Sequence, residues 1–286
     1  MYDISQINKV IVHAGTFHAD DVFSVAYINL MKKYLHQAPV QVIRAIRNPA
    51  PAQNMENGYL AIDIGKGEFD PHQDDESKKI CRADGNAYAA FGLVVRAFHE
   101  GFLNEDEYEL LDRKFIKPLD MYENSGRNNN QLAQCIVSFN KNWDAEASDS
   151  NTRFTKAVEV ATVILDQYID NLRSLARAKK LADEAEVDGE TVYLDRYAPI
   201  HAFFADRDEV KFIGFPSSRS GYQVVSVKNS MGENKKLFPE CLRGLNLKSK
   251  CNSAGLNFCH NDGFMAIFQD KDAAKRYMDT LFTPNE

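Results

Sequence analysis

Residues 9–30, KVIVHAGTFHADDVFSVAYINL, set the architecture of the first part of the chain. The run that ends at His13 is short and mostly apolar, and a loop containing Gly15 follows it. Apolar side chains then recur at roughly helical spacing from Val22 to Leu30, which predicts a helix. A strand, a loop and a helix in this order are typical of an α/β domain, whose sites lie at the carboxyl ends of its strands.

Later segments repeat the strand pattern and then change to a helical one. Residues 40–46 (VQVIRAI) and 58–65 (GYLAIDIG) are compatible with buried parallel strands. Residues 86–181 are mostly helical, and the last helix of this region is predicted to begin at Thr152 and to stop at 188–189. This part of the chain is therefore predicted to form a doubly wound, mostly parallel sheet with helices.

The pattern changes again after this helix. Strand-like runs separated by Gly, Ser and Asn occupy 190–196, 210–216 and 221–229, and an amphipathic helix is predicted at 270–282. We therefore predict an α/β fold with two domains. Residues 1–188 would form an α/β domain that includes the helical segment and the interdomain helix, and residues 189–286 a smaller mixed α+β domain.

The composition is that of a globular protein, with 44% hydrophobic and 26% charged residues. The 34 basic and 41 acidic side chains give a net charge of −7, which disfavours broad binding to duplex nucleic acid. Five cysteines without a Cys-x-x-Cys pair indicate free thiols in a reducing compartment. No targeting pattern and no apolar run near the ~20 residues that span a bilayer are visible, so we predict a cytoplasmic protein without a membrane partner.

Histidine and aspartate side chains gather in three segments that the predicted sheet would bring to one edge. His13 and Asp63 end strands, and the loop after His13 and a later segment at 70–75 add further ligand-type residues: His18, Asp20, Asp21, Asp70, His72, Asp74 and Asp75. Mixed His and Asp ligands suit Mn²⁺, Zn²⁺ or Mg²⁺. Two such ions about 3.5–4 Å apart would clamp a phosphoryl group, so we expect a metal-dependent hydrolase of phosphoester bonds. Taken alone, His13 could be a core histidine and the two aspartates could cap a helix.

These three segments and a fourth, at 115–126, resemble the successive motifs of a known family. HAGTFHADD (13–21), DIG (63–65), FDPHQ (69–73) and FIKPLDMYENSG (115–126) resemble the motifs of the MYG1 family, a branch related to the DHH phosphoesterases. FPECLRGL (238–245) and GLNFCHNDGF (255–264) resemble its closing segments. The resemblance runs from about residue 9 to residue 282. It implies a DHH-like domain, a second domain that closes over the substrate, and 3′–5′ exonuclease-like hydrolysis of RNA or short oligonucleotides.

Carried over position by position, the resemblance implies five metal ligands: His13, His18, Asp20, Asp63 and Asp120. We assign catalytic roles to Asp21 and His72, with His72 as candidate general acid, and substrate binding to Arg243 and His260. Without the resemblance, Asp120 would be interpreted as a solvated residue at a helix end and Arg243 as a surface salt-bridge residue. The cofactor would be one or two divalent ions, Mn²⁺ first, with Mg²⁺ or Zn²⁺ as alternatives. The partner would be short RNA, another oligonucleotide or a phosphorylated small molecule, and a homodimer is left open.

Departures from the family pattern concern the second ion and the phosphate. Pro71 stands where the family has the first His of D-H-H-Q, so one imidazole is missing. Either the site holds one ion strongly and the other weakly, or Asp74 or Asp75 substitutes a carboxylate. Glu123 replaces the second Asp of D-x-x-D-N-G, and a Gly-Gly pair of the tail is absent at 266–267. Two alternatives therefore stay open: a divergent metal- or nucleotide-binding protein with little turnover, and a small-molecule phosphatase or pyrophosphatase.

Overall fold

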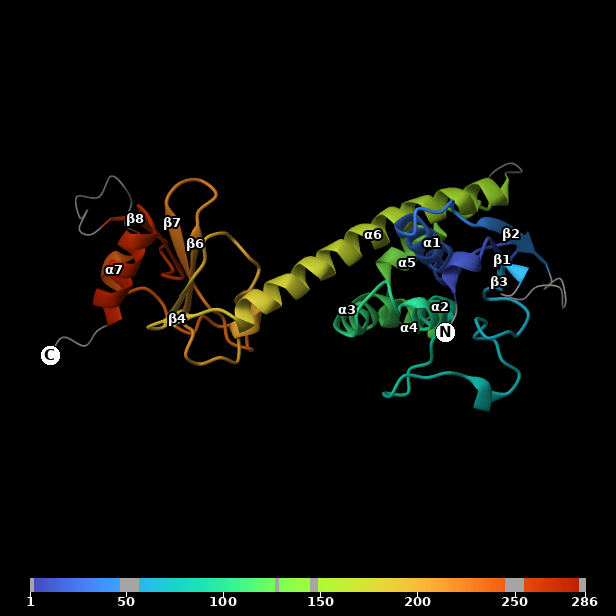
Figure 1. Ribbon diagram of the computed structural model, residues 1–286, viewed down its shortest axis with the longest axis horizontal. Coiled ribbons are helices and arrows are strands. Elements are labelled where there is room, and N and C mark those ends of the chain that lie inside the picture. Colours follow the sequence, from blue (N-terminus) through green and yellow to red (C-terminus); the bar gives the residue numbers. More distant parts are fainter. Residues whose placement is uncertain (1–2, 47–56, 127–128, 145–148, 245–254, 283–286) are drawn as a thin grey trace. The chain divides into compact units, whose positions relative to one another are not determined.

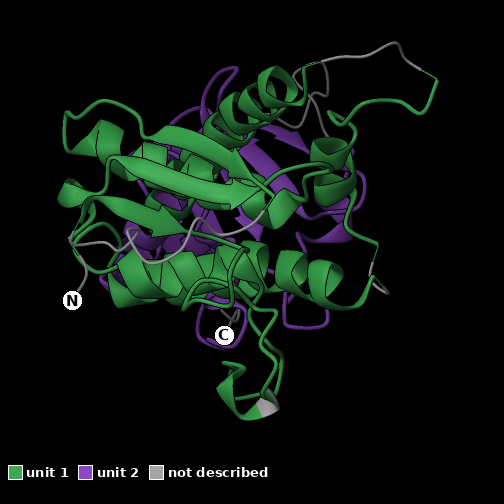
Figure 2. Cartoon of the chain, turned by 90° about the vertical axis from the view of Figure 1, so that its right-hand side faces the viewer, with its two compact units in different colours: residues 1–173 green, residues 174–286 purple. Residues whose placement is uncertain are grey.

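The computed structural model (Figure 1) describes residues 3–46, 57–126, 129–144, 149–244 and 255–282. The chain divides into two compact units, residues 1–173 and 174–286, which Figure 2 shows in different colours. The division falls within the helix α6 (Ser150–Asp183), and the domain boundary predicted from the sequence lies at 188–189. The physical reason is that the last turns of α6 bury Ala178 and Ala182 in the core of the second unit.

The first unit contains a three-stranded parallel sheet in the order β2-β1-β3. The central strand β1 (Lys9–His13) pairs with β2 (Gln41–Ala45) on one side and with β3 (Tyr59–Ala61) on the other, and Ile11 lies opposite both Ile43 and Ala61. The three apolar residues of β1 before His13 are fully buried. The parallel sheet confirms the predicted α/β fold, and it brings the ends of β1 and β3 to one edge.

Helices enclose this sheet and form the core of the unit with it. The helix α1 (Ala19–Tyr34) is buried over most of its length, and its Phe23 ring lies 5.6 Å from that of Phe91 on α2 (Ala90–Phe98) and 5.3 Å from that of Phe115. The chain then continues through α3 (Glu105–Leu111), the π-helical segment η4 (Asp112–Ile116), α4 (Lys117–Ser125) and α5 (Gln131–Val137). Short 3-10 turns lie at Ile4–Gln6 and Glu76–Lys78. The predicted helical region is confirmed.

The helix α6 begins close to the predicted position but ends earlier. The Asp149 carboxylate accepts hydrogen bonds from the backbone N–H of Asn151 and the hydroxyl of Thr152, as a cap residue does. The predicted stop at 188–189 is wrong, because the helix ends at Asp183. Gly189 instead has φ +61° in the turn between two short strands, β4 (Val187–Asp188) and β5 (Thr191–Tyr193), where glycine adopts this conformation at little cost.

The second unit is built on a six-stranded mixed sheet in the order β4-β5-β6-β7-β9-β8. Strands β5 and β6 (Phe212–Pro216) are parallel, and the other neighbours are antiparallel. The remaining elements are β7 (Tyr222–Ser226), β8 (Leu256–Cys259), β9 (Met265–Phe268), α7 (Lys271–Phe282), η5 (His201–Phe204) and η6 (Glu240–Leu242). Ala273, Ala274 and Met278 of α7 join Phe212 and Phe268 in one buried cluster, which confirms the amphipathic helix predicted at 270–282.

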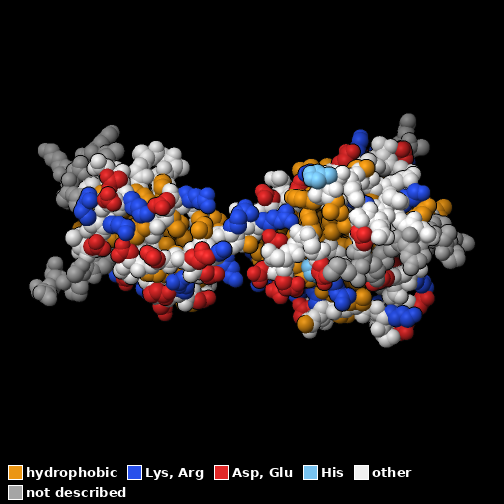
Figure 3. Space-filling view, viewed as in Figure 1, with side chains coloured by type: hydrophobic (Ala, Val, Ile, Leu, Met, Phe, Trp, Pro, Cys, Tyr) orange, Lys and Arg blue, Asp and Glu red, His pale blue; other side chains and the backbone are white. Residues whose placement is uncertain are grey.

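The surface of each unit is of mixed charge. On the face shown in Figure 3, both acidic and basic side chains occur on each unit. Among the described residues, every helix is too short or too polar to cross a bilayer. Cys81, Cys135 and Cys241 are exposed free thiols and Cys259 is a buried one, as the sequence predicted for these four cysteines, whereas Cys251 lies outside the described residues.

Candidate metal centre

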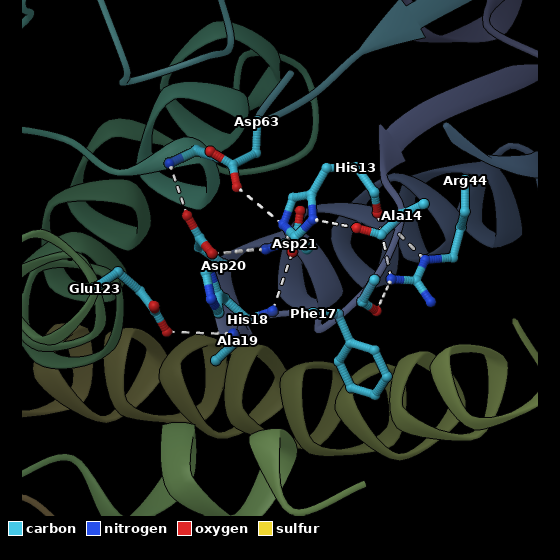
Figure 4. A network of polar contacts seen from close by, with 12 residues as sticks. His13, Ala14, Phe17, His18, Ala19, Asp20, Asp21, Arg44, Asp63 and Glu123 are labelled. Carbon is cyan, nitrogen blue, oxygen red and sulfur yellow. Dashed lines mark hydrogen bonds and ion pairs between the residues drawn. The ribbon is translucent and has the colours of Figure 1, made fainter. Parts of the chain in front are cut away.

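Three groups of side chains in the first unit have the composition of divalent-metal sites. In each group, one potential ligand atom per residue lies within 4.8 Å of the others. The groups are His13 with His18, Asp21 and Asp63; His18 with Asp20 and Glu123; and Asp63 with Asp70 and His72. Because His18 and Asp63 each belong to two groups, the three groups form one continuous cluster at the ends of β1 and β3. Figure 4 shows the residues of the first two groups.

Asp21 connects the start of α1 to the end of β1. His18 is the N-cap of α1, and its backbone N–H donates to the Asp21 carboxylate at 3.0 Å, as in a capping box. The same carboxylate oxygen lies 2.8 Å from Nε2 of His13. The hydrogen bond to Asp21 raises the pKa of His13 to about 9, whereas burial lowers the pKa of His18. The capping of α1 therefore fixes the position of two predicted ligands.

Asp63 lies just beyond β3 with an unusual backbone conformation. Its φ is +54°, which non-glycine residues adopt rarely and mostly where function or a tight turn requires it. Its carboxylate lies 3.5 Å from Nε2 of His13 and 3.1 Å from Nδ1 of His72. Burial, together with the charge of Asp21, raises the pKa of Asp63 to about 7. Asp63 thus reaches both ends of the cluster, as a bridging ligand would.

Glu123 is a potential ligand that the sequence analysis did not assign to the site. It accepts a hydrogen bond from the backbone N–H of Ala19 at 3.2 Å and lies with Asp20 and His18 in one group. Burial raises the pKa of Glu123 to about 7, and burial with the charges of Asp21, Asp63 and Glu123 holds the pKa of Asp20 well above its ordinary value. The available signal was its place in the family motif D-x-x-D-N-G, where it keeps the carboxylate.

The cluster has the chemistry that a divalent cation requires. Asp20, Asp21, Asp63 and Glu123 bring four carboxyl groups together, and three of the four have raised pKa values. Among the described residues, Oδ1 of Asp21 and Oδ1 of Asp63 are buried without a hydrogen-bond partner, although His72 lies at ion-pair distance from the latter. Buried acceptors without donors are costly, and an ion bound between them would satisfy both. The residues present therefore fit a divalent metal.

The third group lies in the segment that carries Pro71. Asp70 is buried, its carboxylate accepts backbone N–H groups from Lys66 and His72, and it lies 3.1 Å from Nδ1 of His72. The expected substitute ligands have other partners, because Asp74 pairs with Lys66 and Asp75 accepts from the backbone N–H and hydroxyl of Ser77. Asp70 is therefore the carboxylate that the structure places beside His72.

Asp120 is fully buried but belongs to none of the three groups of described residues. Its Oδ2 lies 2.6 Å from the guanidinium of Arg82, and its Oδ1 accepts from the backbone N–H of Gly92 at 3.3 Å. Burial raises the pKa of Asp120 to about 7, in spite of Arg82. The interpretation of Asp120 as a solvated residue is thus wrong, because its side chain is buried and forms an ion pair with Arg82.

Arg243 and His260 lie in the second unit, beside the turn that contains Gly263. Nε of Arg243 donates to the carbonyl of Phe238 at 3.1 Å, and Nη1 lies 3.8 Å from the Glu240 carboxylate. Nδ1 of His260 accepts the backbone N–H of Asp262 at 3.1 Å. Both side chains are partly buried, and substrate binding by either stays a prediction.

Arg44 of β2 holds the loop between β1 and α1 in place. Its guanidinium donates to the carbonyls of His13 and Gly15 and to the hydroxyl of Ser150. Figure 4 shows Arg44 beside His13 and Phe17. It also lies over the rings of Phe17 and Phe154, at 5.4 and 4.9 Å from their centroids. This arrangement fixes the loop that carries His18. The sequence did not indicate this role, because Arg44 stands within a strand-like run like any other polar residue.

Comparison with known proteins identifies the family of the chain. The model of the Uncharacterised protein family (UPF0160), MYG1_exonuc, matches residues 9–280. The MYG1 protein of Saccharomyces cerevisiae is 23% identical and that of Schizosaccharomyces pombe 22% identical, over 93% and 95% of this chain and 93% and 96% of the yeast proteins. A mouse protein named MYG1 exonuclease is 20% identical over 93% of this chain and 82% of its own length. The family model spans almost all of the 286 residues, so the resemblance is confirmed and the chain belongs to the MYG1 family (UPF0160).

Proposed function

We propose that this protein is a metal-dependent hydrolase of phosphoester bonds that acts as an exonuclease on RNA or short oligonucleotides. The observation that carries the proposal is the convergence of His13, Asp20, Asp63 and Glu123, from the ends of β1 and β3 and from α1 and α4, on one cluster of buried carboxylates, in which Oδ1 of Asp21 has no hydrogen-bond partner among the described residues. The name of the mouse relative, an exonuclease, supports the same reaction class. Mn²⁺ is the proposed ion, because mixed imidazole and carboxylate donors suit it, and Mg²⁺ and Zn²⁺ are the alternatives.

The residues of the cluster would hold the ion or ions and orient the substrate. His13, His18 and Asp20 would bind together with Asp21, Asp63 and Glu123, and the third group offers a further position. A bound divalent ion supplies Lewis-acid polarisation of the phosphoryl oxygen and lowers the pKa of a water molecule. His72 is 74% exposed, and Asp63 and Asp70 orient its ring through Nδ1, so Nε2 is available to give a proton to the leaving oxygen.

We expect the purified protein with Mn²⁺ to shorten end-labelled RNA oligomers one nucleotide at a time, faster than an Asp20→Ala control. The assay uses RNA and DNA oligomers, dinucleotides and pyrophosphate as parallel substrates, and elemental analysis gives the number of ions per chain. Two tightly held ions with cleavage support the hydrolase. Cleavage of pyrophosphate alone would favour the small-molecule phosphatase, and the absence of any cleavage above the control would contradict the proposal and favour the divergent binding protein.

The affinity for Mn²⁺ is expected to rise with pH between about 6 and 8. Asp63 and Glu123 have pKa values raised to about 7, so near pH 6 a metal ion must displace their protons before it binds. Each displaced proton weakens binding by about tenfold per pH unit below the pKa. The proton on His13, whose pKa is about 9, acts in the same direction. Titration calorimetry in buffers of different ionisation enthalpy measures the affinity for Mn²⁺ and the number of protons released on binding. A pH-independent affinity without proton release would contradict this ligand set.

A further inference from the structure

The metal cluster opens into a larger cavity within the first unit. This cavity has a volume of about 850 Å³, and His72 and Glu123 from the cluster are part of its lining. A second cavity of about 510 Å³ shares Glu68, Ile80, Tyr88 and Leu93 with the first. Because the two cavities have these four residues in common, they adjoin each other at Tyr88, and the second lies on the side of these residues that carries Arg96. We call the two cavities together the Tyr88 groove.

The groove combines basic groups with an apolar surface. Lys66, Lys78 and Lys79 line its part nearer the cluster, and Arg96 lines the further part with its guanidinium 5.8 Å from the centroid of the Tyr88 ring. Lys78 and Arg96 are exposed. Ile80, Leu93 and Tyr88 provide the apolar surface between them. Phosphate groups prefer the basic positions and bases the apolar ones, which is the arrangement typical of single-strand binding grooves.

The acidic residues of the lining restrict where phosphates could lie. Asp70 and Glu123 belong to the metal cluster, and Asp70 also accepts two backbone N–H groups. Glu68 and Glu100 would repel a phosphate, so the backbone of a bound strand is expected to follow the side of Lys78 and Arg96. A basic strip of this short length also agrees with a chain whose net charge is −7.

We propose that the Tyr88 groove binds the nucleotides next to the one that is cleaved, so that the substrate is a single strand of several nucleotides and not a phosphorylated small molecule. The proposal rests on the proposed function for the location of the scissile phosphate at the metal cluster. It adds the place where the adjacent nucleotides bind and two residues, Lys78 and Arg96, that would favour a strand over a mononucleotide.

Binding of a fluorescein-labelled RNA octamer to the metal-free full-length protein tests the groove without any cleavage. Lys78→Gln and Arg96→Gln are each expected to weaken octamer binding by about fivefold to tenfold and to reduce the slope of log K against log salt by ~0.7. Lys156→Gln is the matched control, because Lys156 is an exposed lysine of α6 that lines neither cavity, and it should leave the affinity unchanged. A labelled mononucleotide should bind more weakly than the octamer and respond less to both substitutions.

Hydrolysis of a p-nitrophenyl phosphodiester with Mn²⁺ separates the two proposals. Octamer binding that depends on Lys78 and Arg96 supports the groove, whether or not the ester is cleaved. If the ester is not cleaved, only the proposed hydrolase activity is contradicted. Ester cleavage with octamer binding that neither substitution changes would overturn the groove and leave the hydrolase. Equal affinity for the mononucleotide and the octamer would also overturn the groove.

Discussion

The substitution Asp63→Asn is expected to reduce metal-dependent hydrolysis by about 10³-fold, which corresponds to ~4 kcal/mol of transition-state stabilisation. Asp63 belongs to two of the three ligand groups and lies near both His13 and His72, so its loss affects the whole cluster. Asparagine keeps the size of the side chain and tolerates the φ of +54°, so the backbone is not disturbed. Elemental analysis should show fewer ions per chain, and an unchanged ion count with full activity would exclude Asp63 from the centre.

Stability measurements without metal separate a ligand from a merely structural residue. The pKa of Asp63 is about 7 in the folded chain against an ordinary 3.8, so its favourable contribution is complete below pH ~4 and is lost as the pH rises through 7. Asparagine does not titrate, so it avoids the cost of a buried carboxylate above pH 7. At pH 8 the metal-free variant is therefore expected to unfold at a temperature roughly 3–6 °C higher than the parent protein, with a smaller difference at pH 5. A variant less stable than the parent at pH 8 would contradict this explanation.

The part of the site that the sequence predicts well is the part that is local. His13, His18, Asp20 and Asp21 lie within nine residues, and the order of strand, loop and helix is sufficient to bring them to one edge of the sheet. Asp63 follows from the same rule, because parallel strands end at the same edge. The α/β fold and this part of the site could therefore be predicted from short stretches of sequence.

Residues that come from distant segments were harder to assign. Glu123 reaches Ala19 across 104 positions of the chain. Asp120 and Glu123 lie three residues apart on one face of α4, so which of them reaches the cluster depends on the position of α4 along its axis, which the sequence pattern does not fix. Asp70, Asp74 and Asp75 are close in the sequence, but only Asp70 is held beside His72, by hydrogen bonds from the backbone N–H groups of Lys66 and His72. The predicted end of α6 was wrong because Gly189 indicates a turn, and a turn can follow a strand as well as a helix.

The second large effect is expected at Arg82, which holds two carboxylates inside the first unit. Its guanidinium contacts Asp112 at 2.6 Å and Asp120 at 2.6 Å, and it lies 3.9 Å from the centroid of the Tyr88 ring. The N-cap of α2 is an alanine without a capping side chain, and the carboxylates of Asp20 and Asp120 accept N–H groups from its first turn instead. Arg82 therefore balances a buried charge that the start of α2 requires.

We expect Arg82→Met to destabilise the protein by about 3–5 kcal/mol at pH 8, because it removes the cation that lowers the pKa of Asp120, so the buried carboxyl must stay ionised without a partner or take up a proton at a pH where the unfolded chain binds none. The loss should be smaller at pH 5, where the Asp120 carboxyl, with a pKa already near 7, is protonated. Denaturant unfolding at the two pH values measures the difference. The Arg82→Met/Asp120→Leu double variant should recover much of the stability, since it removes both charges.

The metal content of an Asp120→Asn variant decides between the two roles of this residue. A structural partner of Arg82 can lose its charge without changing the number of Mn²⁺ ions bound per folded chain, whereas a ligand cannot. A Cβ at position 92 would come 2.1 Å from the Asp120 carboxylate, so Gly92→Ala displaces this side chain without altering its charge. We expect both variants to be less stable and to keep the parent ion count. Loss of an ion in Asp120→Asn at unchanged fold would instead make Asp120 a ligand, as the family motif implies.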